Sequence, residues 1–252
     1  MTIEYREIQS DRYPIECKYY APEGVATGII LGVHGFAGDM ESSALSALAA
    51  SAVEKGTALL CFNFPAHGTS YAKDSDLTIE NCKKDLLLLA DICRNEHPSA
   101  EKYLFATSFG GFISLLCSGR LADFRFVLRA PAVTMPNHLL TDMLQTTPEA
   151  FAECKVIECG FERKIMLSYD FYEELQQNCI MDQTFDFPML IVHGDADDVV
   201  PHSDIQKFCM QNTRAELCVI HGADHRFKKK GEIDLVINAA MKYWFLNEYS
   251  NV

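Results

Sequence analysis

Hydrophobic residues along this chain gather in short, almost continuous runs separated by amphipathic stretches. Runs that are apolar at nearly every position are typical of parallel strands buried on both faces of a sheet. Six such runs lie at residues 27–33, 58–62, 103–106, 126–130, 189–192 and 216–220. Residues 2–7 and 15–20 instead alternate between apolar and polar side chains, which predicts an opening antiparallel hairpin. The pattern predicts an α/β fold with a twisted, mostly parallel sheet of eight strands flanked by helices.

Amphipathic helices are predicted between these strands. Thr78 is a candidate N-cap, and the apolar residues after it recur at steps of three and four, which places them on one helical face. That stripe consists of Ile79, Cys82, Leu86, Leu89 and Cys93. A second helix is expected at residues 112–121. A last helix carries Ile233, Ile237, Ala240 and Trp244 along one face.

Residues from about 132 to 186 interrupt this alternation after the sixth predicted strand. The segment holds more residues than one crossover helix needs and mixes prolines, acids and large apolar groups, so we expect a small inserted cap in a single domain spanning residues 1–252. Helices are expected at 137–144 and 171–175, with a hairpin about Gly160 at 155–167. The apolar cap residues either form a lid over the reactive site or only the cap's own core. Met143, Tyr169 and Tyr172 are the expected substrate contacts.

Composition narrows the function classes. The 252 residues are 48% hydrophobic, which is enough for a folded core, and the net charge of −13 argues against nucleic acids and anionic membrane surfaces as partners. No stretch approaches the ~18 apolar residues of a membrane span, and the first residues lack the apolar core of a signal peptide. Ten cysteines without CxxC pairs favour free thiols in a reducing cytoplasm. A homodimer is left open.

The residues around Ser108 carry the strongest chemical signal. Ser108 follows an apolar run and precedes a helix-like stretch, with Ala106 two positions before it and Gly110 two positions after it. A nucleophilic serine on a sharp strand-to-helix turn needs small neighbours, because the two backbones come close together. Ala106 departs from the usual glycine by one methyl group. The motif alone is weak, since many loops match it by chance.

Two downstream motifs strengthen it. Asp197 is the fifth residue of His193-Gly194-x-x-Asp197 after one predicted strand, and His225 follows the next strand and a turn at Gly222. The order serine, aspartate, histidine is that of the α/β-hydrolase triad. In an open parallel sheet the carboxyl ends of the strands converge on one crevice. We therefore expect these three side chains to meet.

Each of these residue types has a chemical reason to be there. A serine hydroxyl needs a base to become a nucleophile, and histidine, whose unperturbed pKa is about 6.5, is suited to that task. A carboxylate fixes the histidine tautomer and stabilises the imidazolium. The backbone N–H groups of Phe36 and Phe109 are the expected oxyanion donors. No nucleotide, metal or other cofactor is expected.

Other acids and histidines near these positions are expected to have other roles. Asp195 and Asp198 are interpreted as turn or cap residues, and Asp224 is the less favoured acid. His221, at the end of a predicted strand, is expected to be packed or bonded to backbone. His34 and His67 are expected to tie loops together through hydrogen bonds. A metal site among the aspartates near residue 195 is excluded, because the spacing does not fit a calcium loop.

These motifs resemble the α/β-hydrolase superfamily over nearly the whole chain. Within it, His34-Gly35-Phe36, residues 128–132 and residues 222–227 resemble the small bacterial cinnamoyl (feruloyl) esterases. They also resemble monoacylglycerol-lipase-like and serine-aminopeptidase-like hydrolases. In the cinnamoyl esterases, the residue after His-Gly and the residue after the serine form the oxyanion hole, which implies Phe36 and Phe109 here. The cap matches only faintly, around residues 169–175.

The predicted function is that of a serine carboxylesterase acting on small-molecule esters with apolar or aromatic acyl groups, which include feruloyl or cinnamoyl esters. The first alternative is a serine aminopeptidase or acyl-peptide hydrolase, which would need an acid in the cap, such as Glu173 or Glu174, to hold the substrate amine. The second is a hydrolase-fold protein that binds a ligand without turnover.

Overall fold

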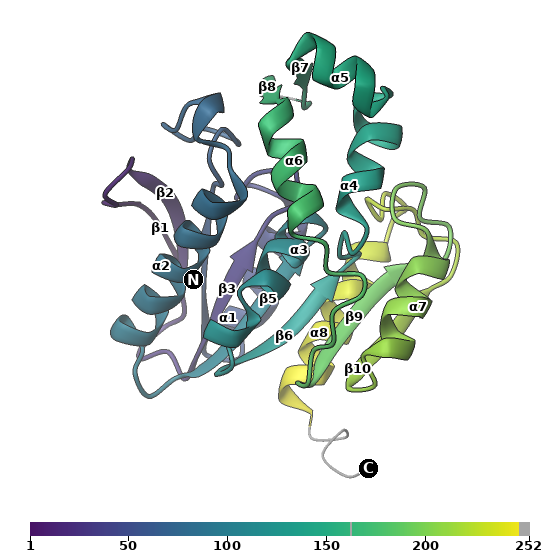
Figure 1. The fold of residues 1–252 in the computed structure, drawn as a ribbon. Coiled ribbons are helices and arrows are strands. Elements are labelled where there is room, and N and C mark those ends of the chain that lie inside the picture. Colours follow the sequence, from purple (N-terminus) through teal and green to yellow (C-terminus); the bar gives the residue numbers. More distant parts are fainter. Residues whose placement is uncertain (162, 247–252) are drawn as a thin grey trace.

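The computed structural model describes residues 1–161 and 163–246, and its centre is one eight-stranded sheet (Figure 1). The strand order is β1-β2-β4-β3-β5-β6-β9-β10. The strands are β1 (Thr2–Ile8), β2 (Ile15–Ala21), β3 (Gly28–Val33), β4 (Thr57–Phe62), β5 (Glu101–Thr107), β6 (Phe124–Arg129), β9 (Met189–Gly194) and β10 (Ala215–Ile220). Eight predicted stretches became these eight strands. The predicted fold class is confirmed.

Strand direction brings the candidate residues to one edge of the sheet. The β1–β2 and β2–β4 pairs are antiparallel, which confirms the opening hairpin, and all other neighbouring pairs are parallel. The carboxyl ends of β3, β5, β6, β9 and β10 therefore lie at the same edge. In such sheets that edge is where ligands bind.

Helices cover both faces of the sheet and create two hydrophobic cores. One face packs against α2 (Ile79–Glu96), α3 (Phe109–Leu116) and α7 (His202–Gln211), and the other against α1 (Ser43–Val53) and α8 (Glu232–Phe245). Alternate residues of one strand face opposite cores: Ile29 and Leu31 of β3 point to the first, whereas Ile30 points to the second. This two-sided burial explains the continuous apolar runs.

The predicted helices are confirmed with changed boundaries. Thr78 caps α2, because its side chain accepts a hydrogen bond from the N–H of Asn81. The helix expected at residues 112–121 begins earlier, directly after Ser108, and ends at Leu116. The regions of α1 and α7 were not predicted as helices. The helix α1 is built mostly from small alanines and serines and has a weak apolar stripe, whereas the short α7 buries only Ile205 and Phe208.

Between β6 and β9 the chain forms an insertion that stands beyond the edge of the sheet (Figure 1). The residues expected to form a hairpin do so, as β7 (Val156–Cys159) and β8 (Ile165–Ser168), and Gly160 between them has φ +94°. The two predicted helices correspond to α4 with the π-helical stretch after it and to α6, whereas α5 was not predicted. These elements are α4 (Met135–His138), the π-helical turn (Leu139–Leu144), α5 (Pro148–Cys154) and α6 (Tyr169–Gln177).

Polar contacts tie the insertion to the loop between β4 and α2. Arg163 donates hydrogen bonds to three backbone carbonyls of that loop, and the N–H of Met166 donates to the carboxylate of Asp74 at 3.0 Å. The three carbonyls belong to Gly68, Ser70 and Ala72. The insertion is therefore attached to the rest of the domain by these hydrogen bonds as well as by its covalent connections to β6 and β9.

Two further observations concern the predicted setting of the protein. All ten cysteines are free thiols, and most of them are buried, as expected for thiols that act as small apolar groups. Within residues 1–161 and 163–246, no helix has the length and apolarity needed to cross a membrane.

Candidate active site

Ser108 lies on a tight turn between β5 and α3. Its φ of +49° and ψ of −114° belong to a region that non-glycine residues rarely adopt. The turn is possible because the chain is small at Gly110, where an added Cβ would lie 2.4 Å from the carbonyl oxygen of His34. The strained turn directs the serine away from the sheet and starts α3 at the next residue. This is the geometry that the sequence motif predicts.

Three side chains that are far apart along the chain form one hydrogen-bonded series. The Nε2 atom of His225 lies 3.0 Å from Oγ of Ser108, and its Nδ1 atom lies 2.8 Å from Oδ2 of Asp197. Ser108 follows β5, His225 follows β10 and Asp197 follows β9. The structure thus brings together all three residues proposed from the sequence.

Asp197 is held as a carboxylate in a closed site. Its side chain is fully buried, and its Oδ1 atom accepts hydrogen bonds from the N–H groups of Val199 at 2.9 Å and Val200 at 2.7 Å. Burial alone would raise the pKa of Asp197, but the hydrogen bonds from His225 and from these two N–H groups outweigh it and lower the pKa. An ionised Asp197 requires the proton of His225 to sit on Nδ1. The Nε2 atom is then free to accept a proton from Ser108.

His193 supports this loop, a role that the sequence motif did not predict for it. It is completely buried, and its Nε2–H donates to the carbonyl of Val200 at 3.0 Å, so it braces the turn that presents Asp197. Burial lowers the pKa of His193, which keeps the ring neutral. Its position at the start of the His193-Gly194-x-x-Asp197 motif was the available signal.

The two predicted oxyanion residues lie beside the serine. Phe109 is the first residue of α3, where helical N–H groups have no partner within the helix. Phe36 follows Gly35, whose backbone lies so close to the serine that an added Cβ would be 3.2 Å from Cβ of Ser108. The rings of Phe36 and Phe109 are 5.7 Å apart, centre to centre, in an edge-to-face contact. Both loops therefore reach the same side of Ser108.

The insertion reaches this pair of rings through Phe171. Its ring centre lies 6.0 Å from that of Phe36 and 6.1 Å from that of Phe109, and its side chain is 1% exposed. Tyr169 and Tyr172, the tyrosines expected to touch substrate, pack against each other and against the ring of Phe151 within the insertion. Met143 is half-buried and packs against the core on the same face. Phe171 is the residue of α6 that contacts the rings beside Ser108.

His34 ties two loops together, as expected, whereas the hydrogen bond of His67 stays within its own turn. The Nδ1–H of His34 donates to the carbonyl of Gly35 at 2.7 Å, and its Nε2 accepts from the N–H of Phe64 at 3.0 Å. His67 bonds through Nδ1 to the carbonyl of Pro65 at 2.8 Å. Burial lowers the pKa of His34 to about 4 and that of His67 to about 3, so both rings are neutral near pH 7.

The expectation for His221 was wrong. Its side chain is 88% exposed rather than packed, and its Nδ1 atom lies 2.8 Å from the carboxylate of Asp195 rather than bonded to backbone. The strand β10 ends one residue earlier, so His221 already lies on the surface turn. Asp195 also accepts from the N–H of Gly222, which fits its expected role as a turn residue. The chain therefore carries a second, exposed histidine–aspartate pair close to the buried one.

No metal cluster forms near these aspartates. In the part of the chain that the structure describes, no three histidine, cysteine, aspartate or glutamate side chains gather in a way that could hold an ion. His202 stacks on His193, with ring centres 5.8 Å apart, and does not join Asp197 as a second ligand.

Comparisons with known proteins agree with this architecture. The family model described as serine aminopeptidase, S33, matches residues 24–166. The chain is similar to palmitoyl-protein thioesterase ABHD10, mitochondrial, of Pongo abelii, with 23% identity over 87% of this chain and 73% of that protein. It resembles the ferulic-acid-bound structure of Est1E from Butyrivibrio proteoclasticus (24% identity, TM-score 0.82, 94% and 97% covered). It also resembles a putative hydrolase from Agrobacterium vitis S4 (23% identity, TM-score 0.81, 96% and 99% covered).

Proposed function

Because this chain belongs to the serine aminopeptidase (S33) family of α/β-hydrolases, we propose that it is a serine hydrolase whose nucleophile is Ser108 and whose substrates are carboxylic esters with apolar or aromatic acyl groups. The observation that carries the proposal is the hydrogen-bonded series from Ser108 through His225 to the buried Asp197. This arrangement has the nucleophile, base and carboxylate of an acyl-transfer enzyme within bonding distance of one another.

The proposed reaction begins with attack of Ser108 Oγ on the acyl carbon. His225 Nε2 takes the serine proton and then gives it to the leaving alcohol oxygen, which departs as the acyl-enzyme forms. Water, deprotonated by the same Nε2 atom, attacks the acyl-enzyme and releases the carboxylic acid, and the proton returns to Ser108. Asp197 keeps the imidazole in the required tautomer and stabilises the imidazolium formed in each step.

In this proposal the N–H groups of Phe36 and Phe109 receive the negative oxygen of the tetrahedral intermediate. Fixed donors aimed at a developing charge are the largest single contribution in many such enzymes, and losing one costs about 3 to 4 kcal/mol. The backbone of Gly35 in contact with Ser108 and the position of Phe109 at the start of α3 support this assignment.

The apolar surroundings favour an apolar acyl group. The rings of Phe36, Phe109 and Phe171 meet beside Ser108 and make that side of the site apolar. We propose that the insertion acts as the cap of the site and that Phe171, more than Tyr169 or Tyr172, contacts the acyl chain. The thioesterase name of the ABHD10 relatives makes fatty acyl thioesters a second substrate type for the same mechanism. The predicted cytoplasmic location stays a prediction, and a homodimer stays open.

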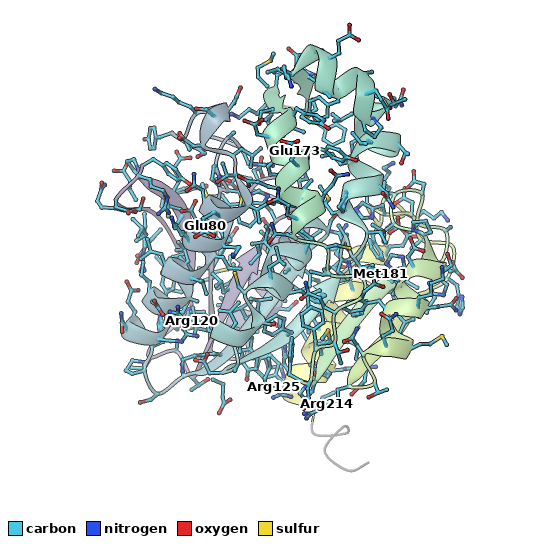
Figure 2. All side chains as sticks on the ribbon, viewed as in Figure 1. Glu80, Arg120, Arg125, Glu173, Met181 and Arg214 are labelled. Atoms are coloured by element: carbon cyan, nitrogen blue, oxygen red, sulfur yellow. The ribbon has the colours of Figure 1, made fainter. Side chains whose placement is uncertain are left out.

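One of the two acids that could hold a substrate amine in a peptidase already has a structural hydrogen bond. Oε2 of Glu174 accepts a hydrogen bond from the N–H of Ile79 at 2.6 Å, so this carboxylate caps the first turn of α2 rather than facing a substrate amine. Glu173 is exposed, and Figure 2 shows it in the upper part of α6, well above the sheet. An aminopeptidase would need a different anchor for the amine.

The test combines a covalent probe with a substrate panel. A fluorophosphonate should label wild type and the Ser118→Ala control but not Ser108→Ala, because the base His225 lies beside Ser108. The panel contains p-nitrophenyl esters of increasing chain length, hydroxycinnamate esters, acyl thioesters and aminoacyl anilides. Turnover of anilides alone would replace the esterase assignment with the peptidase. A folded wild type that no fluorophosphonate labels would favour a binding protein without turnover.

A further inference from the structure

Arg129 carries a buried positive charge at the centre of the candidate site, and the proposed reaction does not use this residue. It is the last residue of β6, the strand between β5, which leads to Ser108, and β9, which leads to Asp197. Its carbonyl accepts the N–H of Ser108 at 2.9 Å. Its side chain is buried, with 8% of the residue exposed. The backbone of Arg129 is therefore one hydrogen bond away from the proposed nucleophile.

The guanidinium group of Arg129 contacts the two residues that follow His225. Its Nη2 donates to the carbonyl of Arg226 at 2.8 Å, and its central carbon lies 4.8 Å from the centre of the Phe227 ring. Phe227 is buried and has φ +54°, a left-handed conformation that is strained for an aromatic residue. A strained residue keeps its conformation only when neighbouring groups hold it. Arg129 supplies two such contacts, one to the carbonyl oxygen of the peptide between Arg226 and Phe227 and one to the ring of Phe227.

The side chain of Arg129 is poorly suited to a purely structural role. Its Nε–H is buried without a hydrogen-bond partner, and burial lowers the pKa of Arg129 to about 10, an effect that the carboxylates of Asp197 and Asp224 partly offset. The group is still charged near pH 7. A buried cation with an unpaired donor is unfavourable for folding, and an apolar side chain of similar size often stabilises a protein as well or better.

We infer that Arg129 is a positioning residue for His225: its guanidinium holds the peptide after His225 in the conformation that keeps the imidazole between Ser108 and Asp197. The inference rests on the proposed function of this site. The negative charge of Asp197 raises the pKa of Arg129 and so offsets part of the effect of burying its cation. Removing the side chain should displace His225 while leaving the substrate contacts of the insertion in place.

Arg125 provides a matched control on the same strand. Like Arg129, Arg125 donates to backbone carbonyls, in its case those of Tyr243 and Trp244 at 2.9 Å each. Its guanidinium also lies near the ring of Tyr243. Figure 2 places Arg125 at the opposite end of the sheet from the insertion. Loss of either arginine removes a guanidinium-to-carbonyl contact of β6, but only Arg129 touches the loop of His225.

The experiment compares Arg129→Met, Arg129→Lys and Arg125→Met with wild type in ester hydrolysis and urea unfolding. We expect Arg129→Met to lower kcat about 10- to 100-fold, the effect of moving a catalytic group by about 1 Å, with KM within about twofold. Arg129→Lys, which keeps the charge and one donor, should recover most of kcat. Arg125→Met should leave kcat unchanged, and its urea midpoint should fall at least as far as that of Arg129→Met.

A second measurement does not depend on turnover. The downfield proton resonance of His225 Nδ1–H, identified by its loss in His225→Gln, should weaken or shift in Arg129→Met and persist in Arg125→Met. Unchanged kcat and an unchanged resonance in Arg129→Met, or an equal loss of kcat in Arg125→Met, would overturn the inference. If wild type hydrolyses no ester, the proposed function fails, and the resonance alone then decides whether Arg129 positions His225.

Discussion

Replacing Asp197 by asparagine tests the reasoning about the site most directly. Asparagine is nearly the same size, and its carbonyl oxygen can still accept the hydrogen bonds that Val199 and Val200 donate to Oδ1. Its NH₂ group, however, would then face Nδ1 of His225 at the 2.8 Å separation now occupied by a carboxylate oxygen. Two donors cannot share this contact. His225 must therefore give up its Nδ1 proton and carry the proton on Nε2 instead.

The consequence for catalysis follows from that tautomer. An Nε2–H pointing at Ser108 Oγ, now 3.0 Å away, can donate a hydrogen bond but cannot remove the serine proton. A histidine held in the wrong tautomer costs about 10⁴ in kcat, equivalent to about 5.5 kcal/mol of barrier. Binding contacts elsewhere are unchanged, so KM should stay near the wild-type value. The fold should remain intact, because the loop keeps both backbone hydrogen bonds.

The assay is p-nitrophenyl ester hydrolysis at pH 7.5, with Asp195→Asn as the control. Asp195 bonds to Nδ1 of His221 at the same 2.8 Å distance in the same loop, but His221 is exposed and contacts no nucleophile. We expect Asp195→Asn to retain kcat within about twofold. Activity of Asp197→Asn within tenfold of wild type, or an equal loss in Asp195→Asn, would refute the assigned role of the buried pair.

Three further predictions concern stability and the acyl site. The pKa of His34 is lowered to about 4 and that of His67 to about 3. Below pH 6.5 the unfolded chain therefore binds more protons than the folded chain. The free energy of unfolding should fall as the pH drops from 6.5 toward 4, by ~3 kcal/mol per histidine. Urea midpoints at pH 7.5 and 5 should differ less in His67→Phe than in wild type; an equal difference would contradict this reasoning. Gly110→Ala should lower the free energy of unfolding in urea by more than about 3 kcal/mol, because the added methyl group would meet a backbone carbonyl. Its control is Gly119→Ala, where nothing lies within 4 Å of the added Cβ, and we expect a change of less than about 0.5 kcal/mol. Similar midpoints for these two variants would show that the close approach is relieved elsewhere. Phe171→Ala should lower the free energy of unfolding by about 3 to 5 kcal/mol, because the ring is buried. The same variant should raise KM for long acyl esters more than for acetate esters. Equal changes in KM would show that Phe171 does not contact the acyl chain.

The strands and the order of the site were readable from the sequence for a physical reason. A parallel strand covered on both faces must be apolar at nearly every position, so β3, β4 and β9 appear as unbroken runs. The serine, aspartate and histidine follow such runs, and a parallel sheet places all their ends at one edge. Small neighbours around Ser108 were equally local, because the turn itself demands them.

Local pattern failed where packing rather than periodicity decides. The helix α1 is rich in small residues, and its place depends on α8 and the sheet, so its sequence has no strong amphipathic stripe. The same holds for the insertion, where the short helix α5 was missed and the contacts of Tyr169 and Tyr172 with Phe151 appear only in the folded chain. Which face of α6 turns toward Ser108 depends on contacts with residues more than 60 positions away, as Phe171 shows.

The sequence by itself therefore determined the fold class and the three residues that should meet, because burial on two faces, turn sterics and acid–base chemistry each restrict which residue types can stand at a position. Only the tertiary structure showed that His221 and Asp195 form a second, exposed histidine–aspartate pair beside the buried one. Only the tertiary structure brought Arg129 beneath the peptide after His225, since that contact joins residues 97 positions apart. Such contacts depend on where separate loops end in space, and no local spacing along the chain encodes that position.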